Sequence, residues 1–96
     1  MSDLIDRPEA LRFEQTVAAP DGSQARVWAD YAVQGRTRSL LHVEAATALR
    51  GSGAAGRFMQ ALADHARAEG LTLAPRCSYA VAWFKRHPDQ GDVLAG

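Results

Sequence analysis

One glycine-rich turn governs the interpretation of this chain: Arg50-Gly51-Ser52-Gly53-Ala54-Ala55-Gly56. An apolar, strand-like segment precedes it and a helix-like segment follows it. Three glycines in seven residues indicate a backbone that turns tightly and lies close to another group. A helix N-terminus carries unpaired backbone N–H groups and a partial positive charge, which suit it to binding phosphate. The turn therefore predicts an anion site, and the neighbouring segments decide which kind.

Three segments before the turn are predicted to be β-strands. Apolar and polar residues alternate in Leu11–Val17, Ala25–Val33 and Arg38–Ala45. Turn-forming residues separate these segments at Pro20–Ser23 and at Gln34–Thr37. Because the turns are short, the three strands are expected to be antiparallel neighbours.

The chain after the turn alternates helix, strand and helix. Apolar residues at helical spacing predict a helix over Ala55–Glu69, which Gly70 ends. Leu71–Ala74 is a short strand, and Ser78 is expected to cap a second helix over Tyr79–His87. A helical crossover makes the fourth strand parallel to the third. The predicted fold is α+β, in the order β-β-β-α-β-α, with a mixed and mainly antiparallel sheet whose last two strands are parallel.

The two ends of the chain carry weaker signals. Residues 1–10 are polar and contain Pro8, so they are predicted to form a flexible tail before a single domain over residues 11–96. Asp89–Gly96 is expected to pack loosely. A length of 96 residues with 47% hydrophobic residues suits one globular domain with one core.

Charge is balanced overall but unevenly placed. The net charge is zero, so no global attraction to nucleic acid or to a membrane is expected. Between Arg50 and Arg86 there are six basic residues and two acidic ones, which favours an anionic ligand in that half. Scattered, solvated arginines explain the charge alone equally well.

Cysteine use and hydropathy bear on the compartment. Cys77 is the single cysteine, so no internal disulfide can form, and a reducing compartment is expected. No apolar run approaches the roughly 18 residues of a membrane helix, and the first residues do not resemble a signal peptide. We therefore expect a cytoplasmic protein.

Two known patterns fit the turn, and chain order chooses between them. Gly51-x-Gly53-x-x-Gly56 matches the dinucleotide fingerprint. That fold requires the glycines after a first parallel strand and an acidic residue about 20 positions further on. Here three antiparallel strands come first, and the next strand ends without an acid, at Ala74-Pro75-Arg76. The second pattern, Arg50-x-x-Gly53-x-Ala55, resembles the acyl-CoA pyrophosphate loop of the GCN5-related N-acetyltransferases (GNAT).

Further motifs extend this resemblance from about Phe13 to Val93. They are His42-Val43-Glu44, Ala48-Leu49-Arg50-Gly51-x-Gly53, Ala66-Arg67-Ala68-Glu69-Gly70-Leu71, Pro75-x-Cys77-Ser78 and Arg86-His87-Pro88. In combination they are similar to the small single-domain GNAT proteins that are named for a characteristic cysteine and glycine. Ser52 departs from the pattern, because a basic residue is common there, and Arg50 and Arg57 are expected to compensate.

The resemblance implies an acetyl-CoA-binding fold that transfers acetyl to an amine. The thioester would lie where the two central strands splay apart, with Cys77 beside the acetyl group. Backbone N–H groups of Gly51 to Gly56 would hold the pyrophosphate, and Gly56 is expected to serve mainly close packing of the helix on a strand. The implied cofactor-binding residues are Val43, Glu44, Ala45, Arg50, Gly51, Ser52, Gly53, Ala54, Ala55, Gly56, Arg57, Lys85 and His87.

Three residues are candidates for the chemistry. Cys77, beside Arg76 at a helix start, is either a nucleophile that accepts the acetyl group or a small core cysteine. His42 and Glu44 share one face of a strand and are either a general base or a solvated polar pair.

Two further residues, His87 and Tyr79, are assigned structural roles. His87 is more readily explained as a cap of helix carbonyls than as a phosphate ligand, and Tyr79 as core than as an acid for the CoA thiolate. The histidines and Cys77 lack the spacing of a zinc site, so no metal is expected.

Three classes of function remain open at this stage. The leading hypothesis is an acetyl-CoA-dependent N-acetyltransferase, in which Cys77 serves as a candidate acetyl carrier. The alternatives are a non-catalytic acyl-CoA-binding module and an interaction protein that uses the same fold. The acidic N-terminal half favours a cationic acceptor, such as an amine on a small molecule or a protein lysine.

Overall fold

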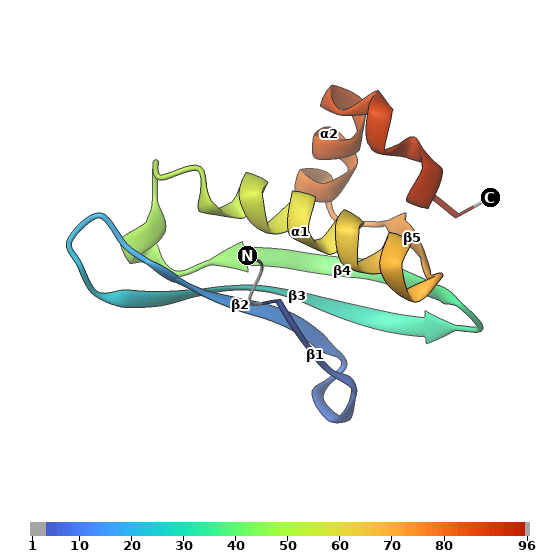
Figure 1. Cartoon of the computed structure of the whole chain (residues 1–96), viewed down its shortest axis with the longest axis horizontal. Helices are drawn as coiled ribbons and strands as arrows, with labels where there is room; N and C mark the ends of the chain where they lie inside the picture. The colour runs from blue at the N-terminus through green and yellow to red at the C-terminus, as the bar shows by residue number, and fades with distance from the viewer. Residues whose placement is uncertain (1–3, 96) are drawn as a thin grey trace.

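The computed structural model describes residues 4–95, which form one five-stranded sheet with two α-helices on the same side of it (Figure 1). The strands are β1 (Ile5–Arg7), β2 (Arg12–Ala18), β3 (Gln24–Gln34), β4 (Thr37–Ala45) and β5 (Thr72–Pro75). The helices are α1 (Ala54–Glu69) and α2 (Ser78–Arg86), and the 3₁₀ turns are η1 (Pro8–Ala10), η2 (Thr47–Leu49) and η3 (Pro88–Val93).

The sheet has the predicted topology over β2 to β5. Its order is β1-β2-β3-β4-β5, with antiparallel pairing up to β4 and parallel pairing between β4 and β5. Helix α1 is the crossover that connects β4 to the parallel strand β5, as the sequence predicted. Helix and strand bounds agree with the sequence prediction to within one or two residues. Leu11 is the exception to the strand pattern, because its positive φ of 52° keeps it outside β2.

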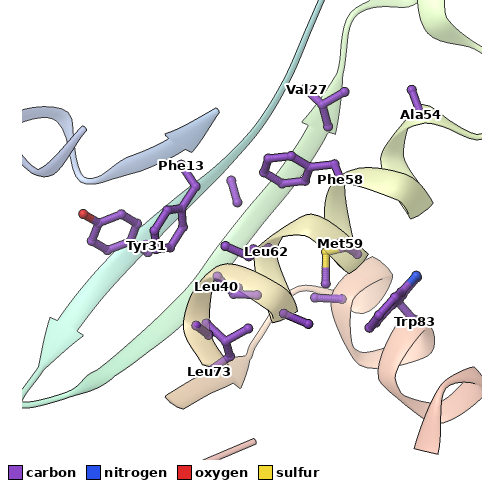
Figure 2. Packing of buried hydrophobic residues seen from close by; sticks show 14 of the residues in the cluster. Phe13, Val27, Tyr31, Leu40, Ala54, Phe58, Met59, Leu62, Leu73 and Trp83 are labelled. Atoms are coloured by element: carbon purple, nitrogen blue, oxygen red, sulfur yellow. The ribbon is translucent and has the colours of Figure 1, made fainter. Parts of the chain in front are cut away.

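The core lies between the sheet and α1. Alternate residues of β3 are buried, and Val27 and Ala29 are completely inaccessible to solvent. From α1, Phe58 and Leu62 pack onto this face, as Figure 2 shows. The period of two in β3 and the helical period in α1 therefore bury the same interface, which fixes α1 across the middle of the sheet.

The helix ends are set by specific residues. Gly70 has φ of 67° and donates its N–H to the carbonyls of Ala66 and Arg67, so it ends α1 as predicted. The predicted cap of α2 was wrong by one residue. Cys77 is extended (φ −82°, ψ 152°) and its sulfur accepts a hydrogen bond from Ala80 N at 3.4 Å, whereas Ser78 is already helical. A thiol can accept this bond in the place that sequence rules give to a hydroxyl.

The expectation of a flexible tail over residues 1–10 was wrong for Ile5 to Ala10. Ile5–Arg7 pairs with β2, and the Asp6 carboxylate accepts a hydrogen bond from the buried Tyr31 hydroxyl at 2.6 Å. Arg7 pairs with the buried Glu14. These partners lie too far along the chain for local sequence rules to find. Residues 1–3 of the expected tail lie outside the described residues.

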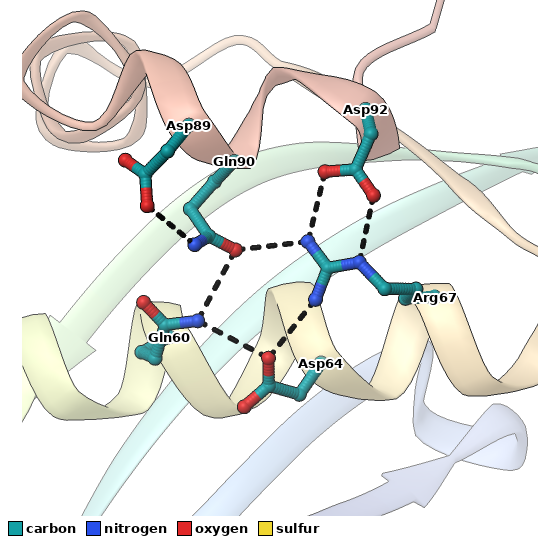
Figure 3. A network of polar contacts seen from close by, with 6 residues as sticks. All are labelled: Gln60, Asp64, Arg67, Asp89, Gln90 and Asp92. Carbon is teal, nitrogen blue, oxygen red and sulfur yellow. Dashed lines mark hydrogen bonds and ion pairs between the residues drawn. The ribbon is translucent and has the colours of Figure 1, made fainter.

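The C-terminal segment does not pack loosely either. Val93 is buried, and Leu94 forms a parallel bridge with Leu73, beside β5. The Arg67 guanidinium of α1 donates two hydrogen bonds to the Asp92 carboxylate, at 2.7 and 2.8 Å (Figure 3). It donates a third to the Gln90 side-chain oxygen at 2.9 Å. This two-point contact matches the fork of the guanidinium to a carboxylate. Gly96 lies outside the described residues.

We predict that Asp92→Asn lowers Tm by a few degrees at neutral pH. The hydrogen bond from Arg67 holds the pKa of Asp92 below its ordinary value of 3.8. A depressed pKa stabilises the fold above the ordinary value, and this stabilisation is lost as pH falls through the depressed value. Circular dichroism melts should therefore show the difference from wild type shrinking below pH 3.8. Asp89→Asn is the control, because Asp89 makes no ion pair within residues 4–95. An equal loss in both variants would contradict the role of the Arg67–Asp92 contact.

Candidate functional site

The last two strands of the sheet, β4 and β5, separate about halfway along β4. Their pairing runs from Thr37 opposite Thr72 to Leu40 opposite Pro75 and then stops. The Leu40 carbonyl accepts two hydrogen bonds, from Arg76 N at 2.9 Å and Cys77 N at 3.2 Å, and the chain then leaves β4 to enter α2. β4 itself continues to Ala45. The predicted splaying of the last two strands is thus confirmed.

The peptide groups of Val43 and Ala45 point to the edge of β4 opposite β3, where β5 no longer pairs with it. Ala46 N donates to Arg26 O at 2.9 Å, which directs the Ala46 peptide group towards β3. Hydrogen bonding alternates from one side of a strand to the other with each residue. Residues 43 and 45 therefore present their N–H and C=O groups away from β3, where β5 no longer pairs with β4.

A β-bulge in β4 determines which side chains face outwards. The register with β3 shifts between Asp30, which pairs with His42, and Tyr31, which pairs with Leu40, so Leu41 is the extra residue. Leu40 points into the core. Without the bulge residue 42 would do the same, but with it His42 and Glu44 turn to the face opposite α1 while Val43 stays on the core side.

His42 and Glu44 contact each other on that face. His42 Nε2 and Glu44 Oε1 are 2.6 Å apart, and about half of each side chain is exposed. An ionised carboxylate can only accept, so Nε2–H donates and a neutral His42 keeps its lone pair on Nδ1. This is the arrangement of a base with a group that orients it.

The glycine turn is held by bonds within the turn. Ser52 Oγ donates to Leu49 O at 2.6 Å and accepts from Ala54 N at 3.2 Å. Arg57 Nη1 donates to Ser52 O at 3.0 Å. Gly53 precedes α1 with φ of 80°, a left-handed conformation that favours glycine. Ser52 thus organises the turn through its side chain and its carbonyl.

Three N–H groups at the start of α1 have no acceptor within residues 4–95. Ala54 N is bonded to Ser52 Oγ, and Arg57 N to Gly53 O at 3.2 Å. The N–H groups of Gly53, Ala55 and Gly56 have no such partner in the described part of the chain. Of the predicted pyrophosphate stretch, these three and the Gly51 N–H, which also has no acceptor in the described part of the chain, are therefore available to a ligand.

Gly56 faces α2 rather than a strand. A Cβ atom placed on it would lie 3.8 Å from the Tyr79 hydroxyl oxygen and 3.9 Å from Trp83 Nε1. Both distances are ordinary van der Waals contacts, so an alanine would fit. The expectation that Gly56 serves close packing of the helix on a strand was wrong.

Cys77 stands at the point of separation. Its sulfur caps α2, its backbone N–H is bonded to Leu40, and its side chain is half-buried against the core. No hydrogen bond within residues 4–95 links Cys77 to His42 or Glu44. The structure therefore brings His42 and Glu44 together on the open face of the sheet, whereas Cys77 packs against the core on the other side.

His87 and Lys85 lie at the other end of α2. His87 is the C-cap, and its Nδ1–H donates to the Trp83 carbonyl at 2.8 Å, so the capping role favoured by the sequence is confirmed. Its ring stacks on Trp83, with ring centroids 4.1 Å apart. Lys85 is exposed, without an ion pair in the described residues.

The sequence interpretation missed the inward-facing polar atoms of α2. Tyr79 was expected to belong to the core, and both Tyr79 and Trp83 do pack against it. Helical spacing predicts which residues are buried but not where an indole nitrogen or a phenol oxygen points.

Comparison with known proteins decides the family. A model of the GCN5-related N-acetyl-transferase family matches residues 12–93. The chain belongs to this family. The resemblance seen in the sequence is thus confirmed, and with it the expected class of enzyme, an N-acetyltransferase.

Known structures agree on the fold of this GNAT member. The solution structure of a GCN5-like candidate N-acetyltransferase from Staphylococcus aureus superposes with a TM-score of 0.65 at 23% identity, covering 100% of this chain and 92% of the other. At that identity the match bears on the fold alone. No curated protein matches the chain. No helix among residues 4–95 has the length and apolar character needed to cross a membrane.

We predict that Gly53→Ala destabilises this GNAT protein by about 1–2 kcal/mol, because a side chain disfavours the left-handed conformation. Gly56→Ala, three residues further on, should be neutral or stabilising by up to about 1 kcal/mol, because it lies in regular helix. Urea unfolding measures both. Equal effects of the two substitutions would show that the backbone conformation of Gly53 does not constrain the turn.

Proposed function

We propose that the protein transfers the acetyl group of acetyl-CoA to an amine at the separation of β4 and β5. One observation carries the proposal: the free edge of β4 at Val43 and Ala45 is continuous in sequence, through η2, with the unpaired N–H groups that open α1. An extended chain with amide groups and a pyrophosphate, such as the CoA arm, complements these two features in order.

The β4 edge offers the pantetheine arm strand-like hydrogen bonds. Val43 and Ala45 each present an N–H donor and a C=O acceptor on the same edge. The amide groups of pantetheine can pair with these as an added strand would. The side chain of Glu44 points to the open face, so its place in this site is beside the acceptor rather than along the arm.

Charge supports the same placement. Arg7, Arg12 and Arg67 are each paired with a carboxylate. Arg50 and Lys85 have no such partner within residues 4–95, and Arg57 is bonded only to the Ser52 carbonyl. Cations without internal partners attract the phosphates of CoA, and their effect falls as salt rises.

In the direct route, His42 Nδ1 takes a proton from the incoming ammonium while Glu44 holds the ring through Nε2–H. The free amine attacks the thioester carbonyl carbon. The C–S bond then breaks, and CoA leaves as a thiolate that takes up a proton. His42 and Glu44 lie on the open face of the sheet, which is where the acceptor approaches.

In the two-step route, the Cys77 thiolate attacks the thioester carbonyl carbon and CoA leaves as its thiolate. The free amine then attacks the acetyl-cysteine carbonyl carbon, and the C–S bond breaks to return Cys77 to the thiolate form. The proton that the nitrogen loses passes to the CoA thiolate. At the helix start that Cys77 caps, the Ala80 N–H donates a hydrogen bond to the sulfur at 3.4 Å and so holds it in one position. The acceptor proposed for either route is a cationic amine, on a small molecule or a protein lysine, in a reducing, cytoplasmic compartment.

The direct and two-step routes predict different behaviour of Cys77. In the two-step route, wild type mixed with acetyl-CoA alone gains the mass of one acetyl group on Cys77, and Cys77→Ala loses nearly all turnover while still binding CoA. Intact-protein and peptide mass spectrometry measure the adduct. Full turnover in Cys77→Ala without any adduct would rule that route out in favour of direct transfer. CoA binding without turnover on a panel of amines would instead identify a non-catalytic acyl-CoA-binding module.

The base is tested by steady-state kinetics. We predict that His42→Gln lowers kcat/KM by about 100-fold, because the proton acceptor is lost. Glu44→Gln keeps a hydrogen-bond acceptor, so its loss should be smaller. Asp30→Asn, which alters the neighbouring residue of β3 on the same face, is the control. A kcat/KM unchanged by His42→Gln would contradict the assignment.

A further inference from the structure

Two hydrogen-bond donors of α2 have no protein partner in the described residues. Trp83 is 2% exposed, yet its indole N–H has no acceptor within residues 4–95, and the same is true of the Tyr79 hydroxyl. Tyr79 is partly buried, and neither of the two polar atoms is fully closed off from solvent, so a ligand can reach both donors. Figure 2 shows the Trp83 nitrogen on the ring edge turned away from Leu40 and Leu73.

Both donors are directed at the start of α1. Trp83 Nε1 lies 3.9 Å, and the Tyr79 oxygen 3.8 Å, from the position that a Cβ of Gly56 would take. Gly56 is also one of the three residues at the start of α1 whose N–H groups lack an acceptor in the described residues. Two side-chain donors from α2 and backbone donors from α1 thus converge on one place.

The orientation of Trp83 is fixed by its neighbours. The His87 ring stacks on the indole at 18° between planes, and His87 Nδ1–H is bonded to the Trp83 carbonyl. Phe84 meets the same ring edge-on at 5.1 Å. Because these contacts hold the indole in one orientation, the N–H can bind a ligand with little loss of side-chain entropy.

We propose that Trp83 Nε1–H and the Tyr79 O–H donate hydrogen bonds to the pyrophosphate held at the N-terminus of α1, so that the anion site spans two helices. This inference rests on the proposed function, since it assigns two further ligands for the same cofactor. It also gives Gly56 a role. Alanine would fit at this position, but its methyl group would stand between the α2 donors and the anion.

The first test uses the two indole N–H signals of the ¹⁵N-labelled full chain, which come from Trp28 and Trp83. Inorganic pyrophosphate and CoA should each shift the Trp83 signal downfield, as a new hydrogen bond does. The Trp28 signal should stay in place, because Trp28 lies on the open face of the sheet. A Trp83 signal that does not move at saturating CoA overturns the inference while leaving CoA binding intact. A wild type that does not bind CoA overturns this inference and the proposed function together.

The second test measures Kd for CoA by calorimetry in three variants. Trp83→Phe and Tyr79→Phe each keep the ring and remove one donor, and each should weaken binding by about tenfold, as loss of a hydrogen bond to a charged group does. Gly56→Ala keeps both donors and should also weaken binding while its Tm holds or rises. Trp28→Phe is the matched control. Inorganic pyrophosphate used as a competitor should lose affinity by the same factor in each variant.

A purely structural role for these side chains predicts a different result. Trp83→Phe and Tyr79→Phe would then lower Tm without changing Kd, and Gly56→Ala would bind CoA as wild type does. That pattern overturns the inference. Because Gly56→Ala does not remove any core side chain, it decides the question even where Trp83→Phe folds poorly.

Discussion

The proposed site depends on the Leu40 carbonyl oxygen, which accepts two backbone hydrogen bonds. A carbonyl that takes hydrogen bonds from both Arg76 N and Cys77 N ends the parallel pairing and turns the chain into α2. β4 has five residues left at that point, and their outer edge has no strand to pair with in the described chain. The same turn brings the Cys77 sulfur to the start of a helix. The free edge and the capped thiol are thus two results of one backbone contact.

Local patterns predicted the elements well, because their signals are short in range. Alternation in β3 and the helical spacing of α1 follow directly from the two periodicities of buried faces. The glycine turn before α1 was predicted from signals of the same short range, and Gly53 does take the left-handed conformation that favours glycine. The glycine turn alone matched both the dinucleotide fingerprint and the acyl-CoA loop. The order of strands and helices along the chain decided between these two patterns.

Long-range partners were beyond such patterns. Asp6 accepts a hydrogen bond from Tyr31, and Asp92 accepts one from Arg67; each pair is 25 residues apart in the sequence. Both ends of the chain were therefore wrongly predicted to be loose. The bulge at Leu41 is set by pairing with β3 rather than by residue type, yet it decides that His42 faces outwards. The direction of the Trp83 nitrogen depends on stacking with His87, which no spacing rule contains.

Ion pairs and one partly buried hydrogen bond join segments of the chain that are separate in the sequence. Burial and the hydrogen bond to Asp6 raise the pKa of Tyr31 to about 12, so this hydroxyl remains a donor and holds β1 in place. Arg7, Arg12 and Arg67 likewise join separate segments through carboxylates. Around the start of α1, by contrast, donors outnumber the acceptors of the described chain, which leaves them to an anionic ligand.

Amide hydrogen exchange tests most directly whether the separated strands form the CoA site. In the free protein the amides of Val43 and Ala45 should exchange fast, because no strand accepts from them, while those of His42 and Glu44 are protected by β3. Saturation with acetyl-CoA should slow exchange at Val43, Ala45, Ala55 and Gly56. Unchanged exchange at these four amides in the acetyl-CoA-bound protein would show that the ligand binds elsewhere.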